Sequence, residues 1–346
     1  MKMDVGKYMK KLEGLKTVLT TPKKIVITTH SRPDADALGS SLGLMLFLKK
    51  LHHQVDVITP TGYPDFLKWM KGEDQVMVYT NGNEEKAVQR VNEADLIFCL
   101  DFSALSRIDK LGDVVGEAKG DKVLIDHHLE PEDFAKYALH SIKAASTAEL
   151  IYQFICEIGG CDLVDVDIAE CLYAGINTDT GSFRHSNVTK TVFDVSAALV
   201  EKGADTSKVA KLIYDTNSEN RLRLLGYALS ENLIVLSEYN TAYFALSEKI
   251  LKKFNAQMGD TEGLVNYALS IKGIKLAALF KESDDGIKMS FRSVNSFSVN
   301  ELARTHFNGG GHKNAAGGKS EMSLEDTVHK FENLLKKYKI ELTTEN

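Results

Sequence analysis

Short apolar runs alternate with amphipathic helical patterns through the first half of the chain. The predicted strands cover residues 24–29, 54–59, 95–101 and 122–126. The predicted helices cover residues 4–20, 38–50, 147–158 and 168–176. Strands this apolar are typical of a sheet that is buried on both faces. The pattern therefore predicts an α/β fold whose mainly parallel, doubly wound sheet is covered by helices.

The second half of the chain has a different character. Residues 189–230 are helical throughout, and two hairpin signals follow, one within 233–246 and one within 276–293. A glycine-rich loop is expected at 308–312 and an amphipathic helix at 324–338. We therefore predict a first domain over 1–190, a helical connector over 191–232 and a smaller mixed α/β domain over 233–346.

Charge and composition limit the kinds of ligand. The 346-residue chain carries a net charge of −6, whereas proteins that hold long duplexes by their phosphates are usually basic. A short anionic ligand is expected, and long duplex nucleic acid is not. No apolar run approaches the ~20 residues of a membrane span, and the N-terminus lacks the apolar core of a signal peptide. We expect a cytoplasmic protein without membrane association, with its four cysteines buried and reduced.

Clusters of polar residues stand at the ends of first-domain elements. They comprise His30 with Asp34 and Asp36, then Asp101, then Asp126 with His127 and His128, and finally Asp179. A single Asp after a strand is most often a helix cap or a turn residue. Four clusters in this order, at the edge where open α/β sheets place ligands, favour one common site.

Six of these side chains form a candidate metal-ligand set. They are His30, Asp34, Asp36, Asp101, His127 and Asp179. Six ligands are too many for one ion that also holds a water, but they suit two ions ~3.5–4 Å apart that share a carboxylate. Asp101 is the predicted bridge, because it leaves a central strand. A carboxylate-rich set with some imidazole favours Mn²⁺ or Mg²⁺, and zinc and iron stay open as alternatives.

The remaining residues of these clusters are candidates for catalysis. A water between two cations loses a proton near neutral pH and attacks phosphorus. Asp126 is expected to accept the second ring N–H of a histidine, and His128 is expected to face the substrate and stabilise charge on the phosphoryl oxygens. Asp101, Asp126 and His128 are the predicted catalytic residues.

A second candidate site lies in the C-terminal half. Gly310 and Gly311 allow backbone N–H groups to approach an anion closely. His312 and Arg292 can add charged donors, with Arg292 as a bidentate clamp on phosphate. The alternative is a plain glycine turn with a structural histidine.

These motifs carry a resemblance that covers nearly the whole chain. His30-x-x-Pro33-Asp34-x-Asp36-x-x-Gly39-Ser40, Asp101, Asp126-His127-His128 and Asp179 resemble the four motifs of the DHH phosphoesterase superfamily. The run from Gly309 to Gly317 resembles the signature of the DHH-associated C-terminal domain. Within the superfamily, the compact chain is most similar to bacterial bifunctional oligoribonucleases that also dephosphorylate 3′-phosphoadenosine 5′-phosphate (pAp).

The resemblance implies a Mn²⁺-dependent phosphodiesterase that acts on short oligoribonucleotides, dinucleotides such as pGpG and pApA, and pAp. It implies that one ion is held by His30, Asp34 and Asp101. The other is then held by Asp36, Asp101, His127 and Asp179. It also implies that His128 lies at the scissile phosphate and that Arg292 and His312 bind substrate.

Three alternatives remain open. They are a phosphodiesterase specific for cyclic or linear dinucleotides, a pyrophosphatase that shares the first-domain motifs, and a nucleotide-binding regulator without catalysis. The glycine-rich run and the hairpin pattern of the second half argue against the pyrophosphatase. A homodimer is also left open.

Overall fold

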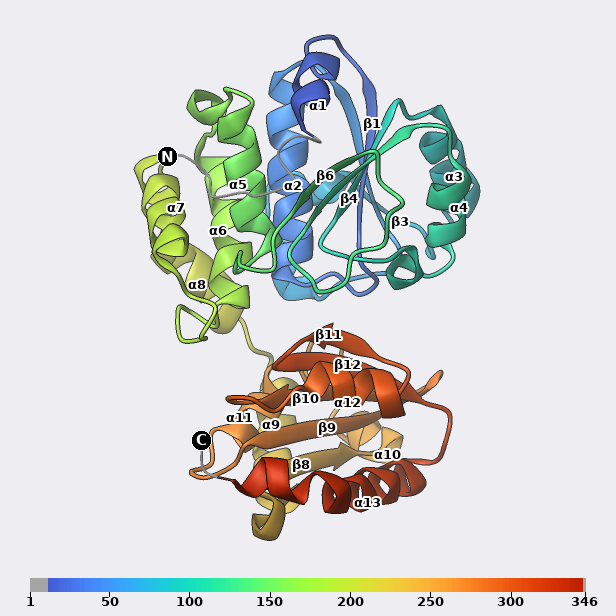
Figure 1. Cartoon of the computed structure of the whole chain (residues 1–346), viewed down its shortest axis with the longest axis vertical. Coiled ribbons are helices and arrows are strands. Elements are labelled where there is room, and N and C mark those ends of the chain that lie inside the picture. The colour runs from blue at the N-terminus through green and yellow to red at the C-terminus, as the bar shows by residue number, and fades with distance from the viewer. Residues whose placement is uncertain (1–11, 345–346) are drawn as a thin grey trace. The chain divides into compact units, whose positions relative to one another are not determined.

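The computed structural model describes residues 12–344, which fall into two compact units that meet between Thr216 and Asn217 (Figure 1). Each unit has its own six-stranded sheet and its own hydrophobic core.

The sheet of the first unit is parallel throughout. Its strands are β1 (Lys24–Thr29), β2 (Gln54–Thr59), β3 (Val76–Val78), β4 (Leu96–Leu100), β5 (Asp121–Asp126) and β6 (Tyr137–His140). They lie in the order β3-β2-β1-β4-β5-β6, and every neighbouring pair runs in the same direction. The strand order reverses between β1 and β4, and such a reversal is where open α/β sheets bind ligands. The predicted fold class is confirmed.

Helices cover both faces of this sheet (Figure 1). Those on one face are α1 (Glu13–Val18), α2 (Ala35–Lys50), α5 (Thr147–Glu157), α6 (Val166–Asp179), α7 (Lys190–Glu201) and α8 (Thr206–Tyr214). The other face packs on α3 (Glu84–Glu93) and α4 (Leu111–Glu117). Successive strand residues point to opposite faces, so that Ile25 and Ile27 belong to the first core and Val26 to the second.

Short 3₁₀ turns complete the connections of both units. They are η2 (Asp65–Leu67), η3 (Glu73–Gln75), η4 (Leu105–Ile108) and η5 (Cys161–Leu163) in the first unit, and η6 (Ser237–Tyr239) in the second.

The second unit contains a mixed sheet. Its strands are β7 (Leu233–Leu236), β8 (Thr241–Leu246), β9 (Leu276–Ser283), β10 (Gly286–Ser293), β11 (Gly310–His312) and β12 (Ala315–Ser320). They lie in the order β11-β12-β10-β9-β8-β7, in which only β8 and β9 run parallel. The two hairpins expected from the sequence are present as β7–β8 and β9–β10.

Two separate apolar clusters sandwich this second sheet. One face packs on α12 (Val299–His306) and α13 (Leu324–Thr343), around Phe280, Phe291 and Phe331. The other face packs on α9 (Glu219–Glu231), α10 (Glu248–Lys253) and α11 (Leu264–Leu269). The unit is therefore the smaller mixed α/β layer structure that the sequence indicates.

Several expectations need correction. The glycine-rich segment at 308–312 is not only a loop, because residues 310–312 form β11 against β12. The domain bounds expected from the sequence stay a prediction; within 191–232, α7 and α8 pack in the first unit, and α9 packs in the second. The expected N-terminal helix over 4–20 is represented by α1, and its residues before 12 lie outside the described part.

The prediction of four reduced cysteines is wrong for two of them. Cys156 and Cys161 form a disulfide, with a Cα–Cα distance of 4.4 Å, whereas Cys99 and Cys171 are buried free thiols. Cys156 lies in the last turn of α5 and Cys161 begins η5, so the tight turn between them brings the two side chains together. Spacing alone did not indicate this pairing.

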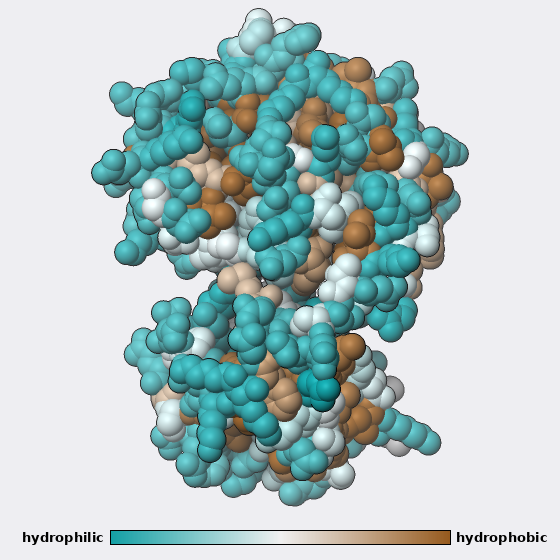
Figure 2. All heavy atoms as spheres, turned by 180° about the vertical axis from the view of Figure 1, so that it is seen from behind, coloured by the Kyte–Doolittle hydropathy of each residue, from teal (hydrophilic) through white to brown (hydrophobic). Residues whose placement is uncertain are grey.

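Polar side chains dominate the face of the molecule that Figure 2 shows, and they separate its apolar spots. Within residues 12–344, no helix combines the length and the apolar character needed to cross a lipid bilayer.

The close contact between α2 and α6 generates a first prediction. A Cβ atom on Gly39 would lie 2.3 Å from the carbonyl oxygen of Cys171. Gly39→Ala should therefore lower the free energy of unfolding of the first unit by about 1–3 kcal/mol, through overpacking against backbone. In Gly226→Ala, the matched control, the new methyl group meets nothing within 4 Å, and helix propensity should stabilise α9 by up to ~1 kcal/mol. Urea unfolding measures the change in the free energy of unfolding for each variant. Equal changes in Gly39→Ala and Gly226→Ala would contradict the packing argument.

Candidate metal centre

The topology gathers the predicted ligands at one edge of the first sheet. Strands β1, β4 and β5 are neighbours and parallel, with Thr29 paired to Leu100 and Leu100 paired to Ile125. The carboxyl ends of all three therefore meet. His30 follows β1, Asp101 follows β4, and Asp126 closes β5.

One group of potential ligands is formed by His30, Asp34 and Asp101. The Nε2 atom of His30 lies 3.4 Å from Asp101 Oδ2 and 3.8 Å from Asp34 Oδ2. Asp34 is also the N-cap of α2, because its Oδ1 accepts hydrogen bonds from the backbone N–H groups of Asp36 and Ala37, both at 3.0 Å. The cap fixes one carboxylate oxygen and leaves the other facing His30.

A second group is formed by Asp36, Asp101 and His127. His127 Nε2 lies 3.4 Å from Asp101 Oδ1, 3.8 Å from Asp36 Oδ2 and 3.4 Å from Asp179 Oδ2. Asp179 is the last residue of α6. The ring nitrogen therefore faces three carboxylates.

Asp101 belongs to both groups. Its Oδ2 faces His30, and its Oδ1 faces His127 and accepts a hydrogen bond from Thr147 Oγ1 at 2.8 Å. The residue is 2% exposed and has a positive φ of 64°, a conformation that is uncommon outside glycine and often marks functional positions. Among the predicted ligands, Asp101 has the geometry of a bridge.

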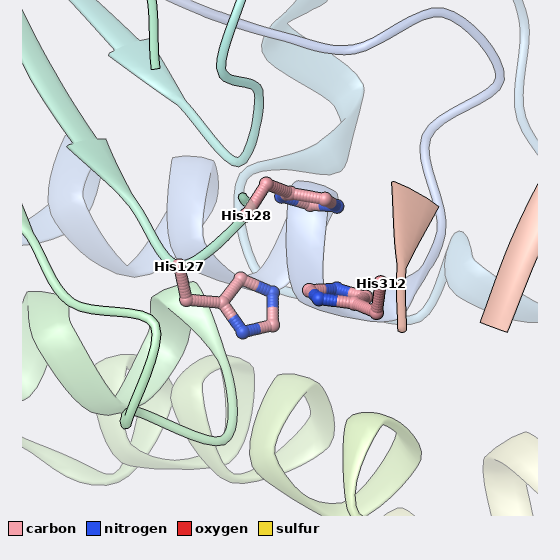
Figure 3. Close-up of side chains that lie close together, drawn as sticks. All are labelled: His127, His128 and His312. Atoms are coloured by element: carbon pink, nitrogen blue, oxygen red, sulfur yellow. The ribbon is translucent and has the colours of Figure 1, made fainter. Parts of the chain in front are cut away.

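Asp126 and His128 form a pair beside these groups. Asp126 is fully buried, and its Oδ1 lies 2.8 Å from His128 Nδ1. A carboxylate orients a neighbouring imidazole in this way. His140 Nε2 lies 2.6 Å from the backbone oxygen of His128 and holds the loop that follows β5. Figure 3 shows the rings of His127 and His128 projecting from this loop; their planes are inclined by 74°.

The N-terminus of α5 is the part of the site that the sequence prediction missed. The backbone N–H groups of Thr147 and Ala148 donate to the two oxygens of Asp36, at 2.7 and 2.8 Å. The positive end of a helix thus stabilises a buried carboxylate. The Ser146-x-x-Glu149 pattern, a capping-box signature, marked this helix start in the sequence. Nothing in the sequence indicated that the helix start would meet Asp36.

Burial and charge shift the pKa values of the carboxylates in opposite directions. Burial raises the pKa of Asp36 well above its usual value, and the charge of Asp101 adds to this effect. Burial likewise raises the pKa of Asp179, with a further contribution from Asp36. For Asp101 burial acts in the same direction, but hydrogen bonds from His127 and His30 outweigh it and hold its pKa well below the usual range. Of these three carboxylates, only Asp101 has its pKa shifted toward the ionised form.

The histidines respond to the same charges. Burial lowers the pKa of His30, but the hydrogen bond to Asp101 and the charge of Asp34 outweigh it and raise the pKa to about 9. Burial also lowers the pKa of His127, but its hydrogen bond to Asp101 and the nearby carboxylate charges together outweigh burial and raise it. Protons thus offset the mutual repulsion of the carboxylates, and a divalent cation would compete with them.

The donor set fits divalent cations. Carboxylate oxygens and imidazole nitrogens converge, and no thiol from residues 12–344 takes part. This chemistry suits Mg²⁺ and Mn²⁺ and also admits other first-row metals. Moreover, Oδ2 of the buried Asp126 has no hydrogen-bond partner among the described residues. A lone buried acceptor of this kind is expected beside a cation or a donor group.

The substrate residues predicted in the second unit lie in one row across its sheet. Arg292 on β10 and His312 on β11 are both paired with Ala315 on β12, so their side chains project from the same face. Gly311 does not offer the N–H group expected of it, because this group donates to Asn300 Oδ1 at 3.0 Å. A Cβ atom on Gly309 would lie 2.0 Å from the carbonyl oxygen of Gly317, so close strand packing also explains the glycines.

Comparison with known proteins places the chain in a family. The DHH family N-terminal domain matches residues 24–176, and the DHHA1 domain matches residues 239–341. A curated protein of Streptococcus mutans, "Probable bifunctional oligoribonuclease and PAP phosphatase NrnA", is 31% identical over 94% of this chain and 100% of its own length. The chain belongs to the DHH family.

Other relatives of this DHH protein differ in their descriptions. A crystal structure of an exopolyphosphatase-related protein from Bacteroides fragilis is 40% identical, with a TM-score of 0.93 over 99% of this chain and 100% of the other. "Cyclic-di-AMP phosphodiesterase GdpP" of Geobacillus thermodenitrificans is 26% identical over 92% of this chain, which spans 49% of that protein. The prediction that this DHH protein is a hydrolase of the phosphoesterase class is confirmed.

The raised histidine pKa values generate a prediction about metal binding. At pH 7 the DHH protein should hold protons on His30 and His127, and a cation must displace them. Metal binding should therefore release protons, and apparent affinity should rise with pH until the pKa of His30, about 9, is passed. Calorimetric titrations with Mn²⁺ in buffers of different ionisation enthalpy measure the number of protons. Binding heats that do not depend on the buffer would contradict the charge balance described above.

Proposed function

We propose that this DHH protein is a Mn²⁺-dependent phosphodiesterase. It hydrolyses very short RNA, including dinucleotides such as pGpG and pApA, to mononucleotides, and it dephosphorylates pAp to AMP. The observation that carries the proposal is the position of Asp101, whose two carboxylate oxygens face two different groups of ligands. A bridging carboxylate of this kind is typical of two-metal phosphoesterase sites. The substrate class is supported by the NrnA relative, which is named for both activities.

The ligands divide into two sets in this proposal. His30, Asp34 and Asp101 would hold one ion, and Asp36, Asp101, His127 and Asp179 would hold the other. Bound divalent ions supply a water whose pKa falls toward 7 and charge that stabilises phosphoryl oxygens. The protein contributes the fixed positions of these ligands through the N-termini of α2 and α5.

His128 has a separate role. Its Nδ1 is held by Asp126, which leaves Nε2 as the atom that faces a bound phosphate. With the ring fixed in this way, Nε2 contacts a phosphoryl oxygen as negative charge develops there. Asp126 is thus a positioning residue in this reaction, and His128 is the catalytic residue that touches substrate.

In the second unit, Arg292 and His312 would bind the nucleotide. A guanidinium group suits a terminal phosphate because it forms two parallel hydrogen bonds. Gly310, the other glycine predicted to bind substrate, would let the nucleotide approach β11, and Gly311 would do so through its lack of a side chain. The net charge of −6 agrees with a short substrate that needs few phosphate contacts.

A second candidate is a phosphodiesterase specific for cyclic or linear dinucleotides, because a cyclic-di-AMP phosphodiesterase is among the relatives. Both candidates use the same metal site, so the ligands do not separate them. The two candidates are separated by rates measured side by side on pAp, pGpG, a five-nucleotide RNA and cyclic di-AMP. Faster cleavage of pGpG and pAp than of cyclic di-AMP supports the first candidate, and the reverse order supports the second. Binding of all four without cleavage would contradict both.

The proposal predicts a specific effect of His128→Ala. Turnover of pGpG with saturating Mn²⁺ should fall by a factor of about 10²–10⁴, as expected for loss of a group that stabilises the transition state. Mn²⁺ affinity should change by less than about threefold, because His128 is outside the proposed ligand sets. His329→Ala, which removes an exposed histidine from α13, is the control and should leave both quantities unchanged. A large loss of Mn²⁺ binding in His128→Ala would show that its role is wrongly assigned.

A further inference from the structure

Glu149 is a buried carboxylate beside the metal centre that belongs to neither ligand set. It is 3% exposed and lies in the first turn of α5. Its Oε2 accepts a hydrogen bond from the backbone N–H of Ala145 at 2.8 Å, and its Oε1 accepts one from Gln153 Nε2 at 3.0 Å. A carboxylate is costly to bury, so its place next to the ligands needs an explanation.

The explanation lies in the peptide group that joins Ala144 to Ala145. The carbonyl oxygen of this peptide lies 3.3 Å from His127 Nδ1, and its N–H is the group that donates to Glu149. A carbonyl oxygen can only accept, so Nδ1 of His127 must carry a proton. In the neutral ring, Nε2 is then the atom with the lone pair, and Nε2 is the atom that faces Asp36, Asp101 and Asp179.

The same peptide segment is also held from its other side. Asn187 Nδ2 donates to the backbone oxygen of Ala145 at 3.2 Å and to the backbone oxygen of Asp179 at 3.1 Å. Rotation of the 144–145 peptide would break its bonds to both Glu149 and His127. The orientation of this peptide is therefore coupled to the ring of one ligand and, through Asn187, to the backbone of another.

We propose that Glu149 is a positioning residue that acts on His127 through the 144–145 peptide group. Its negative charge polarises the peptide, which strengthens the carbonyl as an acceptor and holds His127 in the tautomer that can bind metal. Hydrogen bonds in such a chain strengthen one another, by about 10–30% per bond. The inference rests on the proposed metal site and assigns to Glu149 a role beyond capping α5.

Three variants separate this role from simple helix capping. Glu149→Gln keeps the size and an acceptor oxygen but removes the charge, and Glu149→Ala removes the acceptor as well. Glu301→Gln is the matched control, because Ser298 and Glu301 form the same Ser-x-x-Glu pattern at the start of α12, with Ser298 Oγ accepting from the N–H of Glu301 at 3.3 Å.

Mn²⁺ affinity measured by calorimetry is the first readout. Glu149→Gln should weaken it about three- to tenfold, which is less than the 10–100-fold typical of a direct partner of a ligating histidine. Glu149→Ala should weaken it further, and Glu301→Gln should leave it unchanged. The second readout is the ¹⁵N chemical shifts of the His127 ring in the Mg²⁺-loaded protein. They should report a protonated Nδ1 in the wild type and a mixture of tautomers in Glu149→Gln.

The inference is overturned if Glu149→Gln binds Mn²⁺ like the wild type with an unchanged His127 tautomer, even where it loses stability. If Glu149→Ala fails to fold, the Mn²⁺ affinity and the His127 tautomer of Glu149→Gln still test the inference. These readouts need no nucleotide. A wild-type protein that binds Mn²⁺ but cleaves neither pGpG nor pAp would therefore refute the proposed function while leaving this test intact.

Discussion

The repulsion among carboxylates at the end of the first sheet is the constraint that shapes this protein. Asp36, Asp101 and Asp179 lie around a single imidazole nitrogen of His127. At this degree of burial their charges cannot coexist without compensation. Protonated histidines, helix N-termini and divalent cations are the available sources of positive charge, and the surrounding structure supplies or accommodates each of them.

The fold meets this constraint with ordinary secondary structure. Parallel strands bring His30, Asp101 and Asp126 to one edge because their carboxyl ends must coincide. The N-terminus of α2 is capped by Asp34, and the N-terminus of α5 binds Asp36. Glycine at position 175 admits Asp36 to this place, since a Cβ atom there would lie 2.5 Å from Asp36 Oδ1. The packing of α2, α5 and α6 thus sets the position of the ligands.

Much of this arrangement could be predicted from the sequence because it depends on local signals. Apolar runs that end in Asp or His marked β1, β4 and β5, and the ligands followed directly. Short or weakly apolar strands such as β3 and β11 gave no such signal, because pairing with a neighbour decides their conformation. The roles of Thr147 and Glu149 also escaped prediction, since they depend on contacts between residues far apart in sequence. Gly311 suggested anion binding, whereas close strand packing accounts for much of the need for glycine there.

The most direct test of the account is a count of bound metal. Electron paramagnetic resonance during a Mn²⁺ titration reports both the number of ions per chain and the magnetic coupling between them. We expect two ions per wild-type chain, with a coupled signal because Asp101 would bridge them in the proposed site, and we expect Asp101→Asn to lose that coupled signal. A single uncoupled ion in the wild type, or a coupled pair that survives in Asp101→Asn, would contradict the central claim.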